Sequence, residues 1–542
     1  MNIDSLQPAA PQRIAIIGGG LAGLAAAHRL SELARERGTN IAVTLFERGP
    51  RLGGVIGTER VGGYLIDTGA DSFLTNKPAA VNLCGRLGIA DRLVPTAAQH
   101  RGALVLFDGR PQPVPEGFQL MSPTAIWPML VSPILSPWGK LRMAMEYFVP
   151  PRPVPSVACT FPQPSTLNPQ PLHDESLASF VRRRFGREAL ERLVQPLVGG
   201  IYTSDPEKLS LAATMPRFLE MERDHGSLLA ATLFAREKTA SRQSTANSHS
   251  SGSSPQDGSA TDTKSSGARY GLFAGLAGGM EDLLSALRSR VEASCEVRLN
   301  APVARIVSES QPGSKAPLTL TLSPEDGGEG TRNLPVAGQC YRIELANGSS
   351  STFDAVLVAT ASYRAAGLLG DLDRELAILL GEIEYASSAL VVTGHRLTDV
   401  AHPLNAFGLV IPQRERRKIL AVSFSSRKFP DRAPDGSVLL RTFVGGALQP
   451  ELFNLSDEEL VSLVRAELAD ILGVRGEPEL ARVYRYPRAM PQYHVGHLDR
   501  VARIEALTTR HPGLALAGNA YRGVGIPDVI ASGESAAEAM LA

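Results

Sequence analysis

A glycine-rich segment near the start of the chain has the spacing of a phosphate-binding loop. Gly18-Gly19-Gly20-Leu21-Ala22-Gly23 fits the pattern G-x-G-x-x-G. In that pattern the first glycine permits a tight turn, the second lets a pyrophosphate approach the backbone, and the third lets a helix pack closely on a strand. The helix N-terminus then offers N–H groups and a positive dipole end to the phosphates. The alternative is an ordinary glycine-rich turn, so the flanking residues must decide.

Glu47 supplies the second group that a dinucleotide requires. It directly follows the apolar segment Ile41–Phe46, close to the spacing of about 20 residues that the motif demands. Its carboxylate can accept hydrogen bonds from both ribose hydroxyls. The loop and the acid together predict a dinucleotide site, and at this point leave NAD and FAD open.

A strand, a helix and a second strand must position these groups. Arg13–Ile17 is a predicted buried strand, Leu21–Arg37 has helical spacing, and Ile41–Phe46 is a second apolar strand. They predict the unit of a doubly wound domain. Near the other end of the chain we expect a strand at Leu514–Ala517 and a helix at Ser532–Leu541. If both ends share one sheet, the nucleotide-binding domain is discontinuous.

Three further segments resemble FAD-binding oxidoreductases. Arg48 to Gly54 (RGPRLGG) follows Glu47, as R-x-G-G follows an acid in those enzymes. Gly63 to Ser72 (GYLIDTGADS) is similar to the segment beneath their isoalloxazine ring. The strand before Gly518, with Gly523 to Asp528 (GVGIPD), resembles the element that closes the FAD site in the amine oxidase superfamily. The resemblance implies FAD, with a helix start near the flavin pyrimidine carbonyls, where negative charge develops on reduction.

Other segments resemble a narrower group, the bacterial porphyrinogen oxidases. They are Glu188 to Tyr202 (EALERLVQPLVGGIY), Phe273 to Leu283 (FAGLAGGMEDL) and Met490 to His497 (MPQYHVGH). Members of that family oxidise coproporphyrinogen III or protoporphyrinogen IX. The resemblance implies an α/β fold, in which a Rossmann-like FAD-binding domain carries an inserted mixed α+β substrate domain and a helical membrane-proximal or lid region.

The resemblance also implies positions for the cofactor. Val303 would offer its backbone to the adenine, and Tyr486 stands where relatives often place a tryptophan near the flavin. The implied FAD-binding residues are Gly18, Gly19, Gly20, Leu21, Ala22, Gly23, Glu47, Arg48, Arg51, Gly53, Gly54, Gly69, Ala70, Asp71, Ser72, Val303, Tyr486, Gly518, Gly525, Ile526 and Pro527.

The implied chemistry requires few protein groups. The family transfers hydride from a bridging carbon to the flavin and returns the electrons to dioxygen, so the cofactor performs the difficult step and no catalytic residue is named. The substrate propionates require cations, and Lys77 and Arg101 are the candidates, with solvated surface charges as the alternative for both. The resemblance favours coproporphyrinogen III. Protoporphyrinogen IX, another flavin amine oxidase or desaturase, and a non-catalytic FAD-binding scaffold remain alternatives.

Composition excludes other classes of function. Among 542 residues, Lys+Arg and Asp+Glu both number 55, so a nucleic-acid surface is not expected. The four cysteines are far apart, which argues against a disulfide framework or a zinc site, and His494 with His497 is too small a set for a metal. The polar segment Met1–Gln12 lacks a positively charged start and an apolar stretch, so we do not expect it to act as a secretory signal. The apolar stretch Ile126–Leu135 is too short to span a bilayer. We expect a cytoplasmic protein with peripheral membrane contact at that stretch, and hand-over of its product to a ferrochelatase.

The remaining patterns predict the domain order. Residues 239–268 and 309–339 are low in apolar residues and are expected to be disordered inserts, with a strand tip at Leu318–Leu322. The expected order is FAD-binding domain (1–88), helical substrate region (89–238), insert (239–268), FAD-binding domain (269–308), insert (309–339), FAD-binding domain (340–362), substrate domain (363–485) and FAD-binding domain (486–542).

Periodicity predicts several elements within this order. Glu175–Leu197 has the pattern of an amphipathic helix whose arginines 182–184 form a solvated face. Further helices are expected at Leu283–Val291 and at Leu460–Leu472, the second capped by Ser456 or Asp457. Strands are expected at Val303–Val307, at Tyr341–Leu345 and at Phe353–Ala359, the last two joined by a hairpin at Asn347-Gly348.

Overall fold

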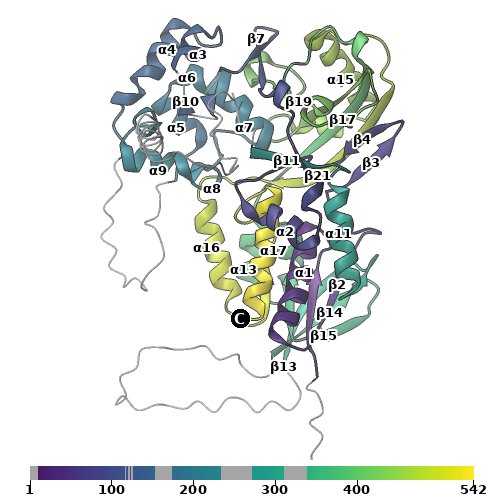
Figure 1. Cartoon of the computed structure of the whole chain (residues 1–542). Helices are drawn as coiled ribbons and strands as arrows, with labels where there is room; N and C mark the ends of the chain where they lie inside the picture. Colours follow the sequence, from purple (N-terminus) through teal and green to yellow (C-terminus); the bar gives the residue numbers. More distant parts are fainter. Residues whose placement is uncertain are drawn as a thin grey trace, which may run out of the picture.

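The computed structural model describes residues 10–115, 118–119, 122–123, 126–152, 174–232, 272–310 and 339–542. The insert predicted at 239–268, the strand tip predicted at Leu318–Leu322, nearly all of the second insert, and Cys159 lie outside the described residues. Three units are visible: a lower unit around helices α1, α11 and α17, an upper helical unit, and an upper sheet unit (Figure 1).

The lower unit is built on a parallel five-stranded sheet. Its order is β12-β2-β1-β16-β22, so strands from both ends of the chain share one sheet, as the sequence predicted. The strands are β1 (Gln12–Ile17), β2 (Ile41–Phe46), β12 (Glu296–Arg298), β16 (Ala355–Val358) and β22 (Leu514–Leu516). Ile14 and Ile16 are buried on one face and Ala15 and Ile17 on the other, because successive strand residues point to opposite faces.

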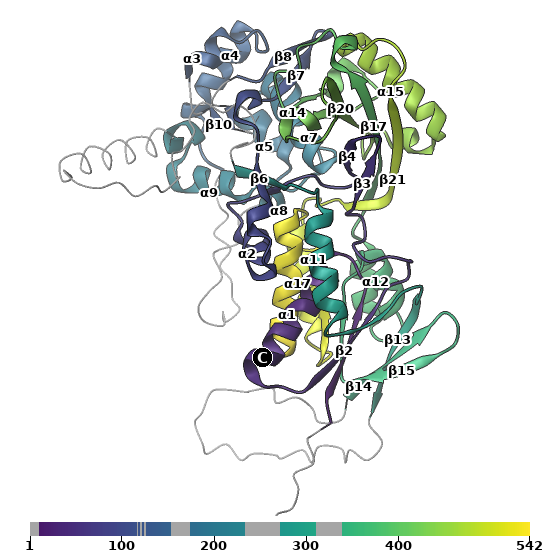
Figure 2. The same cartoon turned by 45° about the vertical axis from the view of Figure 1, so that its right-hand side comes forward.

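Helices cover the first face of this sheet. They are α1 (Leu21–Arg37), α2 (Pro78–Leu87), α11 (Glu281–Glu292) and α17 (Ile526–Met540). The expected helix at Leu21–Arg37 is confirmed. The last helix begins at Ile526 rather than Ser532, because Pro527 fits the first turn of a helix and its missing N–H has no role there. Figure 2 shows α1, α11 and α17 side by side.

The second face carries a small antiparallel sheet and more helices. The strands are β13 (Val303–Ser310), β14 (Gln339–Leu345) and β15 (Ser350–Phe353), and the helices are α12 (Ser362–Leu369), α13 (Arg374–Gly381) and α16 (His497–Thr508). The Asn347-Gly348 hairpin is confirmed. The single strand expected at Phe353–Ala359 is wrong: Asp354 exchanges hydrogen bonds with Arg13, which directs the chain from β15 into β16 beside β1.

The upper sheet unit contains seven strands in the order β21-β17-β20-β19-β18-β7-β8. The chain contributes β7 (Leu104–Phe107), β8 (Arg110–Pro113), β17 (Tyr385–Arg396), β18 (Gly408–Val410), β19 (Ala421–Phe424), β20 (Ser437–Gly445) and β21 (Leu480–Pro491). α14 (Ser425–Lys428) follows β19, and α15 (Asp457–Leu472) packs on the sheet. Ser456 caps α15 through a capping box with Glu459, so one of the two expected caps is confirmed.

The upper helical unit differs most from expectation. It contains α3 (Ile126–Val131), α4 (Pro137–Ala144), the short helix η3 (Met145–Phe148), α5 (Leu177–Arg184), α6 (Arg187–Ala189), the π-helix η4 (Leu190–Val194), α7 (Gln195–Tyr202), α8 (Leu211–Thr214) and α9 (Pro216–His225). The continuous helix predicted at Glu175–Leu197 is wrong, since α5 ends before Gly186, whose φ of 92° is not helical.

The solvated face predicted for arginines 182–184 is wrong for Arg183 and Arg184, although Arg182 is exposed. The side chain of Arg184 is completely buried and forms ion pairs with Glu146 at 3.1 Å and Glu222 at 2.6 Å. Arg183 pairs with Glu222 and Glu175. Arg182 stays exposed and pairs with Glu207 at the surface, so only Arg183 and Arg184 of the run pack against the helical unit.

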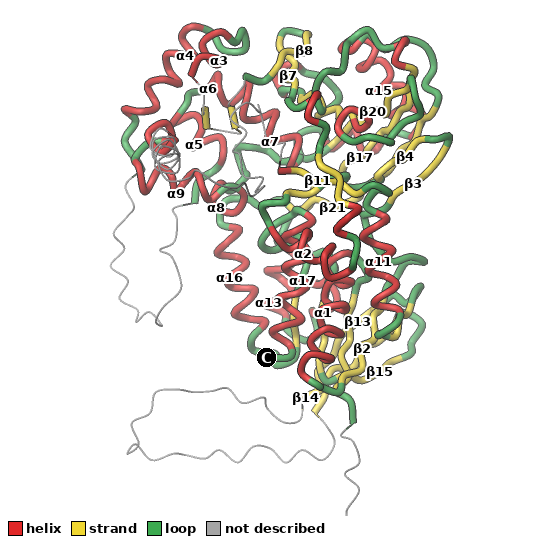
Figure 3. Tube along the Cα trace, in the orientation of Figure 1, coloured by secondary structure: helices red, strands yellow, loops and turns green. Residues whose placement is uncertain are grey.

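Short elements connect the three units (Figure 3). The β3 (Thr58–Val61) and β4 (Tyr64–Asp67) hairpin packs against the seven-stranded sheet. β5 (Phe73–Leu74), β11 (Phe273–Leu276) and β6 (Leu93–Pro95) form a three-stranded sheet, and β9 (Phe118–Gln119) pairs with β10 (Ser122–Pro123). No helix in the described parts of the chain is both long and apolar enough to cross a membrane.

Candidate functional site

The turn between β1 and α1 admits only glycine at two positions. Gly18 has a φ of +109°, and a Cβ there would lie 2.5 Å from the carbonyl oxygen of Ala359. A Cβ on Gly23 would lie 1.9 Å from the carbonyl oxygen of Gly18. Both approaches are too short for real atoms, so the roles of tight turn and close helix packing that the sequence predicted for these glycines fit the structure.

Gly20 differs from Gly18 and Gly23, because nothing lies within 4 Å of a Cβ added there. It is the N-cap of α1, no side chain caps this helix end, and the first turn carries no acidic residue. Leu21 and Ala22 are buried behind it. Uncapped N–H groups facing open space are what an anionic phosphate requires, so this end of α1 fits a pyrophosphate.

Glu47 follows β2 beside this loop. Its carboxylate accepts hydrogen bonds from the backbone N–H groups of Gly19 at 2.8 Å and Gly49 at 2.7 Å. A carboxylate has about four lone-pair directions, so capacity for hydroxyl donors remains. Val303, expected at the adenine, opens β13 two residues after Ala301, whose N–H donates to the Glu47 carbonyl oxygen at 2.9 Å.

The two arginines that follow Glu47 differ. Arg48 is exposed. The guanidinium of Arg51 donates to the carbonyl oxygens of Gly54 at 2.8 Å and Ile56 at 3.1 Å. Arg51 thus holds the turn at Gly53-Gly54 in shape, and Gly53 forms an isolated parallel bridge with Gly20. Sequence reasoning did not predict this role for Arg51.

The segment Gly69–Ser72 is fixed by residues of the upper sheet unit. Arg441 of β20 donates to the carbonyl oxygen of Gly69 and pairs with Asp71 at 2.7 Å. Lys428 of α14 pairs with Asp71 at 2.8 Å and donates to Ser72 at 2.6 Å. Burial alone would raise the pKa of Asp71, but the positive charges of Lys428 and Arg441 more than offset it and hold that pKa well below its usual range.

Tyr486 of β21 reaches the same segment. Its hydroxyl donates to the carbonyl oxygen of Thr68, the residue before Gly69, and burial raises its pKa. Sequence reasoning missed Lys428 and Arg441. The signal available for Arg441 was a lone arginine inside the apolar run of β20, because a buried charge in a sheet requires a partner.

The C-terminal element brings a second helix start to the site. Gly518 has a φ of +131° and donates to the hydroxyl of Ser532. Gly525 is the N-cap of α17, again without a side-chain cap, and Ile526 and Pro527 form the first turn. A Cβ on Gly533 would lie 2.3 Å from the carbonyl oxygen of Ala22, so α17 packs directly on the start of α1.

The Met490–His497 segment holds the loop between β22 and α17. The hydroxyl of Tyr493 donates to the carbonyl oxygen of Asn519 at 2.6 Å and accepts from the N–H of Gly523 at 2.9 Å. The His497 ring stacks on Tyr493, and its Nε2 lies 2.8 Å from the carbonyl oxygen of Tyr521. Within the described ranges no group of three or more His, Cys, Asp or Glu side chains is placed to hold a metal ion.

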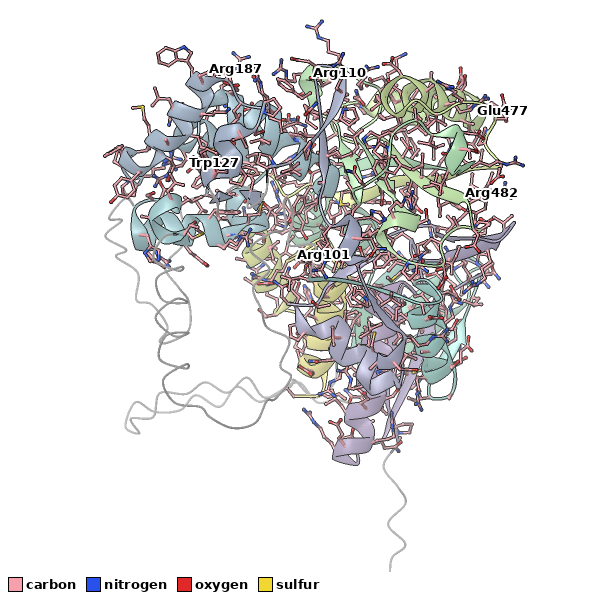
Figure 4. All side chains as sticks on the ribbon, turned by 45° about the horizontal axis from the view of Figure 1, so that its top comes forward. Arg101, Arg110, Trp127, Arg187, Glu477 and Arg482 are labelled. Atoms are coloured by element: carbon pink, nitrogen blue, oxygen red, sulfur yellow. The ribbon has the colours of Figure 1, made fainter. Side chains whose placement is uncertain are left out.

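The two predicted substrate cations lie in different places. Lys77, at the N-cap of α2, binds both carboxylate oxygens of Asp528 in the first turn of α17, at 2.7 and 2.8 Å. Its side chain is half exposed. Arg101 follows the turn Ala98–His100. In Figure 4 it lies in the middle of the view, between Trp127 of the helical unit and Glu477 of the sheet unit.

The fold and this site define a flavoprotein, and comparison with known proteins agrees. The family model described as flavin containing amine oxidoreductase matches residues 21–541. The chain therefore belongs to the flavin-containing amine oxidoreductase family. Its enzyme class and its FAD cofactor follow from this membership, and the fold predicted from sequence is confirmed.

Relatives that match over nearly the whole chain indicate a narrower group within this family. The chain is 32% identical to coproporphyrinogen III oxidase of Bacillus subtilis, covering 97% of each chain. It is 33% identical to coproporphyrinogen III oxidase of Propionibacterium freudenreichii, covering 97% of this chain and 90% of the relative. A crystal structure from Exiguobacterium sp. 255-15, provisionally named a protoporphyrinogen oxidase, superposes with a TM-score of 0.74 at 28% identity, covering 98% of this chain and 99% of the other.

Proposed function

We propose that FAD binds where the starts of α1 and α17 meet. The uncapped N–H groups of α1 and the space before Gly20 support a pyrophosphate there. Glu47 would receive the ribose, with Arg48 nearby on the surface. The isoalloxazine would lie against Gly69–Ser72 and Tyr486, facing the start of α17. Lys428 and Arg441, which the sequence did not predict, would support this placement from the sheet unit.

We further propose that the enzyme oxidises coproporphyrinogen III to coproporphyrin III, with dioxygen as the electron acceptor. The observation that carries this proposal is the full-length similarity to two coproporphyrinogen III oxidases at 32% and 33% identity. A third coproporphyrinogen III oxidase, from Staphylococcus aureus, matches at 28%, and relatives named protoporphyrinogen oxidase match at 27% to 29%. FAD accepts hydride when bound, and the protein has to bind, orient and shield the macrocycle.

Lys77 and Arg101 are proposed to bind substrate propionates. Asp528 holds the Lys77 ammonium by two of its three N–H bonds, which leaves a donor on a half-exposed side chain. Lys77→Met should raise KM more for coproporphyrinogen III, which has four propionates, than for protoporphyrinogen IX, which has two. Arg396→Met is the matched control, because Arg396 is also an exposed cation paired with a carboxylate, at the end of β17.

Substrate choice is tested by following porphyrin fluorescence with both porphyrinogens in parallel. Higher kcat/KM with coproporphyrinogen III supports the proposal. Faster turnover of protoporphyrinogen IX would replace that substrate assignment. Turnover of neither, with flavin bleaching by an amine or a polyene under anaerobic conditions, would place the enzyme elsewhere in its family. Absence of any flavin bleaching would favour a non-catalytic scaffold.

We also propose that the helical unit touches a membrane surface peripherally. Both tryptophans of the chain project from it, Trp127 72% exposed and Trp138 79% exposed, and Phe148 is 79% exposed. Further exposed apolar side chains on α3, α4 and η3 are Val131, Leu141, Met145 and Tyr147. Exposed aromatic clusters of this kind suit the interface of a bilayer.

Vesicle flotation tests this contact. Wild-type protein should float with phosphatidylglycerol vesicles, and Trp138→Glu with Phe148→Glu should stay in the bottom fraction. Ile378→Glu is the control, because Ile378 is an exposed apolar residue on α13. Equal flotation of all three proteins, or recovery of the wild type only in the bottom fraction, would count against a membrane surface.

Hand-over to a ferrochelatase is proposed from the chemistry of the product. A metal-free porphyrin is the substrate that an iron-inserting enzyme consumes, and direct transfer would keep a hydrophobic macrocycle out of water. Purified ferrochelatase should then remove porphyrin from the oxidase faster than porphyrin dissociates into buffer. Equal rates with an inert protein of the same concentration would show release by free diffusion.

A further inference from the structure

A cluster of buried charges lies where the seven-stranded sheet meets residues 67–72. Its cations are Lys428, Arg432 and Arg441, all from the sheet unit. Its carboxylates are Asp67 and Asp71, both from the FAD-binding part of the chain. The side chains of Asp67, Arg432 and Arg441 are 1%, 3% and 2% exposed. The two units therefore meet through complementary charges that are almost completely removed from water.

The cluster has more positive than negative charge. Arg441 forms an ion pair with Asp71 and donates a hydrogen bond to the carbonyl oxygen of Gly69. Arg432 lies 3.6 Å from Asp67 and donates to the carbonyl oxygen of Leu276. Three cations face two carboxylates, which leaves one positive charge without a carboxylate inside the cluster. The Nε of Arg441 is buried and has no hydrogen-bond partner among the described residues. Burying such a donor and such a charge is costly unless a further partner completes the site.

We infer that Arg441, with Lys428 and Asp71, sets the reduction potential of the bound flavin. Reduction adds negative charge to the isoalloxazine, and uncompensated positive charge in a buried place stabilises that charge because water does not screen it. Arg441 is a positioning residue here: it holds Gly69 by hydrogen bonding and contributes its charge across the segment. The inference rests on the proposed placement of FAD against Gly69–Ser72.

Opposite charge changes must then move the potential in opposite directions. Arg441→Gln removes a positive charge and should lower the midpoint potential of the bound flavin. Asp71→Asn removes a negative charge and should raise it. We expect at least a tenfold change in the reduction equilibrium for each, about 30 mV for a two-electron couple. Arg441→Lys keeps the charge, so its midpoint potential should stay close to that of the wild type.

The experiment measures midpoint potentials of the holoenzyme variants by equilibration with reference dyes, with FAD affinity and thermal unfolding measured in parallel. Arg184→Gln is the matched control, because Arg184 is a completely buried arginine with two ion pairs in the helical unit. It should lose stability and leave the potential unchanged. Lys428→Met provides a second cation variant at a side chain 13% exposed, and should also lower the potential.

The outcomes separate this inference from the proposed function. Shifts of Arg441→Gln and Asp71→Asn in opposite directions, with an unmoved Arg184→Gln, support the inference. Shifts in the same direction would show mere loosening of the site and overturn it. Potentials equal to the wild type, with FAD bound and substrate oxidised, would overturn the inference and leave the proposed function standing. Wild-type affinity for FAD in Gly20→Ala, combined with unmoved potentials, would instead contradict the proposed cofactor placement.

Discussion

Gly20 and Gly23 belong to one motif, but a methyl group added to each meets different surroundings. At Gly20 the added Cβ has no atom within 4 Å, and the φ of −74° suits any residue. At Gly23 it would lie 1.9 Å from the carbonyl oxygen of Gly18. Gly20→Ala should therefore impair cofactor binding with little effect on the apoprotein, whereas Gly23→Ala should damage the fold itself.

The magnitudes follow from the two geometries. Restricting the unfolded chain by Gly→Ala contributes about 0.4–1 kcal/mol of stability, and the weaker N-cap offsets part of it, so the apoprotein of Gly20→Ala should change by less than about 1 kcal/mol. If the methyl displaces a phosphate from one or two N–H groups, the loss of about 1.5–3 kcal/mol weakens FAD roughly 10- to 150-fold. Gly23→Ala requires α1 and the Gly18 turn to separate by about 1 Å, at about 1–3 kcal/mol or more.

The assay has two readouts on the same preparations. Urea unfolding of the apoproteins reports stability, and FAD titration by flavin fluorescence reports affinity. Equal affinity of Gly20→Ala and wild type would refute the argument that a pyrophosphate occupies the space before α1. Equal stability of Gly23→Ala and wild type would refute the packing argument at the Gly18 turn.

Three further expectations follow from buried groups. Tyr493→Phe leaves the Gly523 N–H without its partner, so it should lower the free energy of unfolding by about 1–3 kcal/mol and weaken FAD binding. Unchanged values in the urea and FAD titrations would contradict the argument that Tyr493 holds the loop before α17. Burial lowers the pKa of His497 to about 4, so between about pH 6.5 and pH 4 the folded state binds fewer protons than the unfolded state. The free energy of unfolding should therefore fall by about 3 kcal/mol as the pH drops through this range. His497→Phe should flatten this pH dependence in urea melts, and an unaltered dependence would show that other groups cause it. Arg184→Gln leaves Glu146 buried without its cation and removes one of the two arginines that pair with Glu222, so it should cost about 3–5 kcal/mol in the same melts. A loss below about 1 kcal/mol would show that water solvates Glu146 in the variant.

Local patterns were sufficient for the elements whose signals lie within a few residues. The strand–helix–strand unit up to Phe46, the hairpin at Asn347-Gly348 and the cap at Ser456 were predicted because glycine conformations, apolar periodicity and capping act over a single turn. The predicted secondary structure was wrong where contacts between distant residues override the local helical preference. The chain from Glu175 to Leu197 has helical periodicity, but it breaks before Gly186, so that Arg184 can pair inside the unit.

The sequence by itself therefore determined the cofactor class, since the glycine loop, Glu47 and the segments that follow them are contiguous in the chain. Only the tertiary structure decided what supports the proposed flavin side. Asp71 and Arg441 meet across about 370 residues of sequence, and Lys77 meets Asp528 across more than 400. No local sequence pattern predicts such a pairing, because the position of a charged residue in the sequence does not indicate which distant residue it contacts in the folded protein.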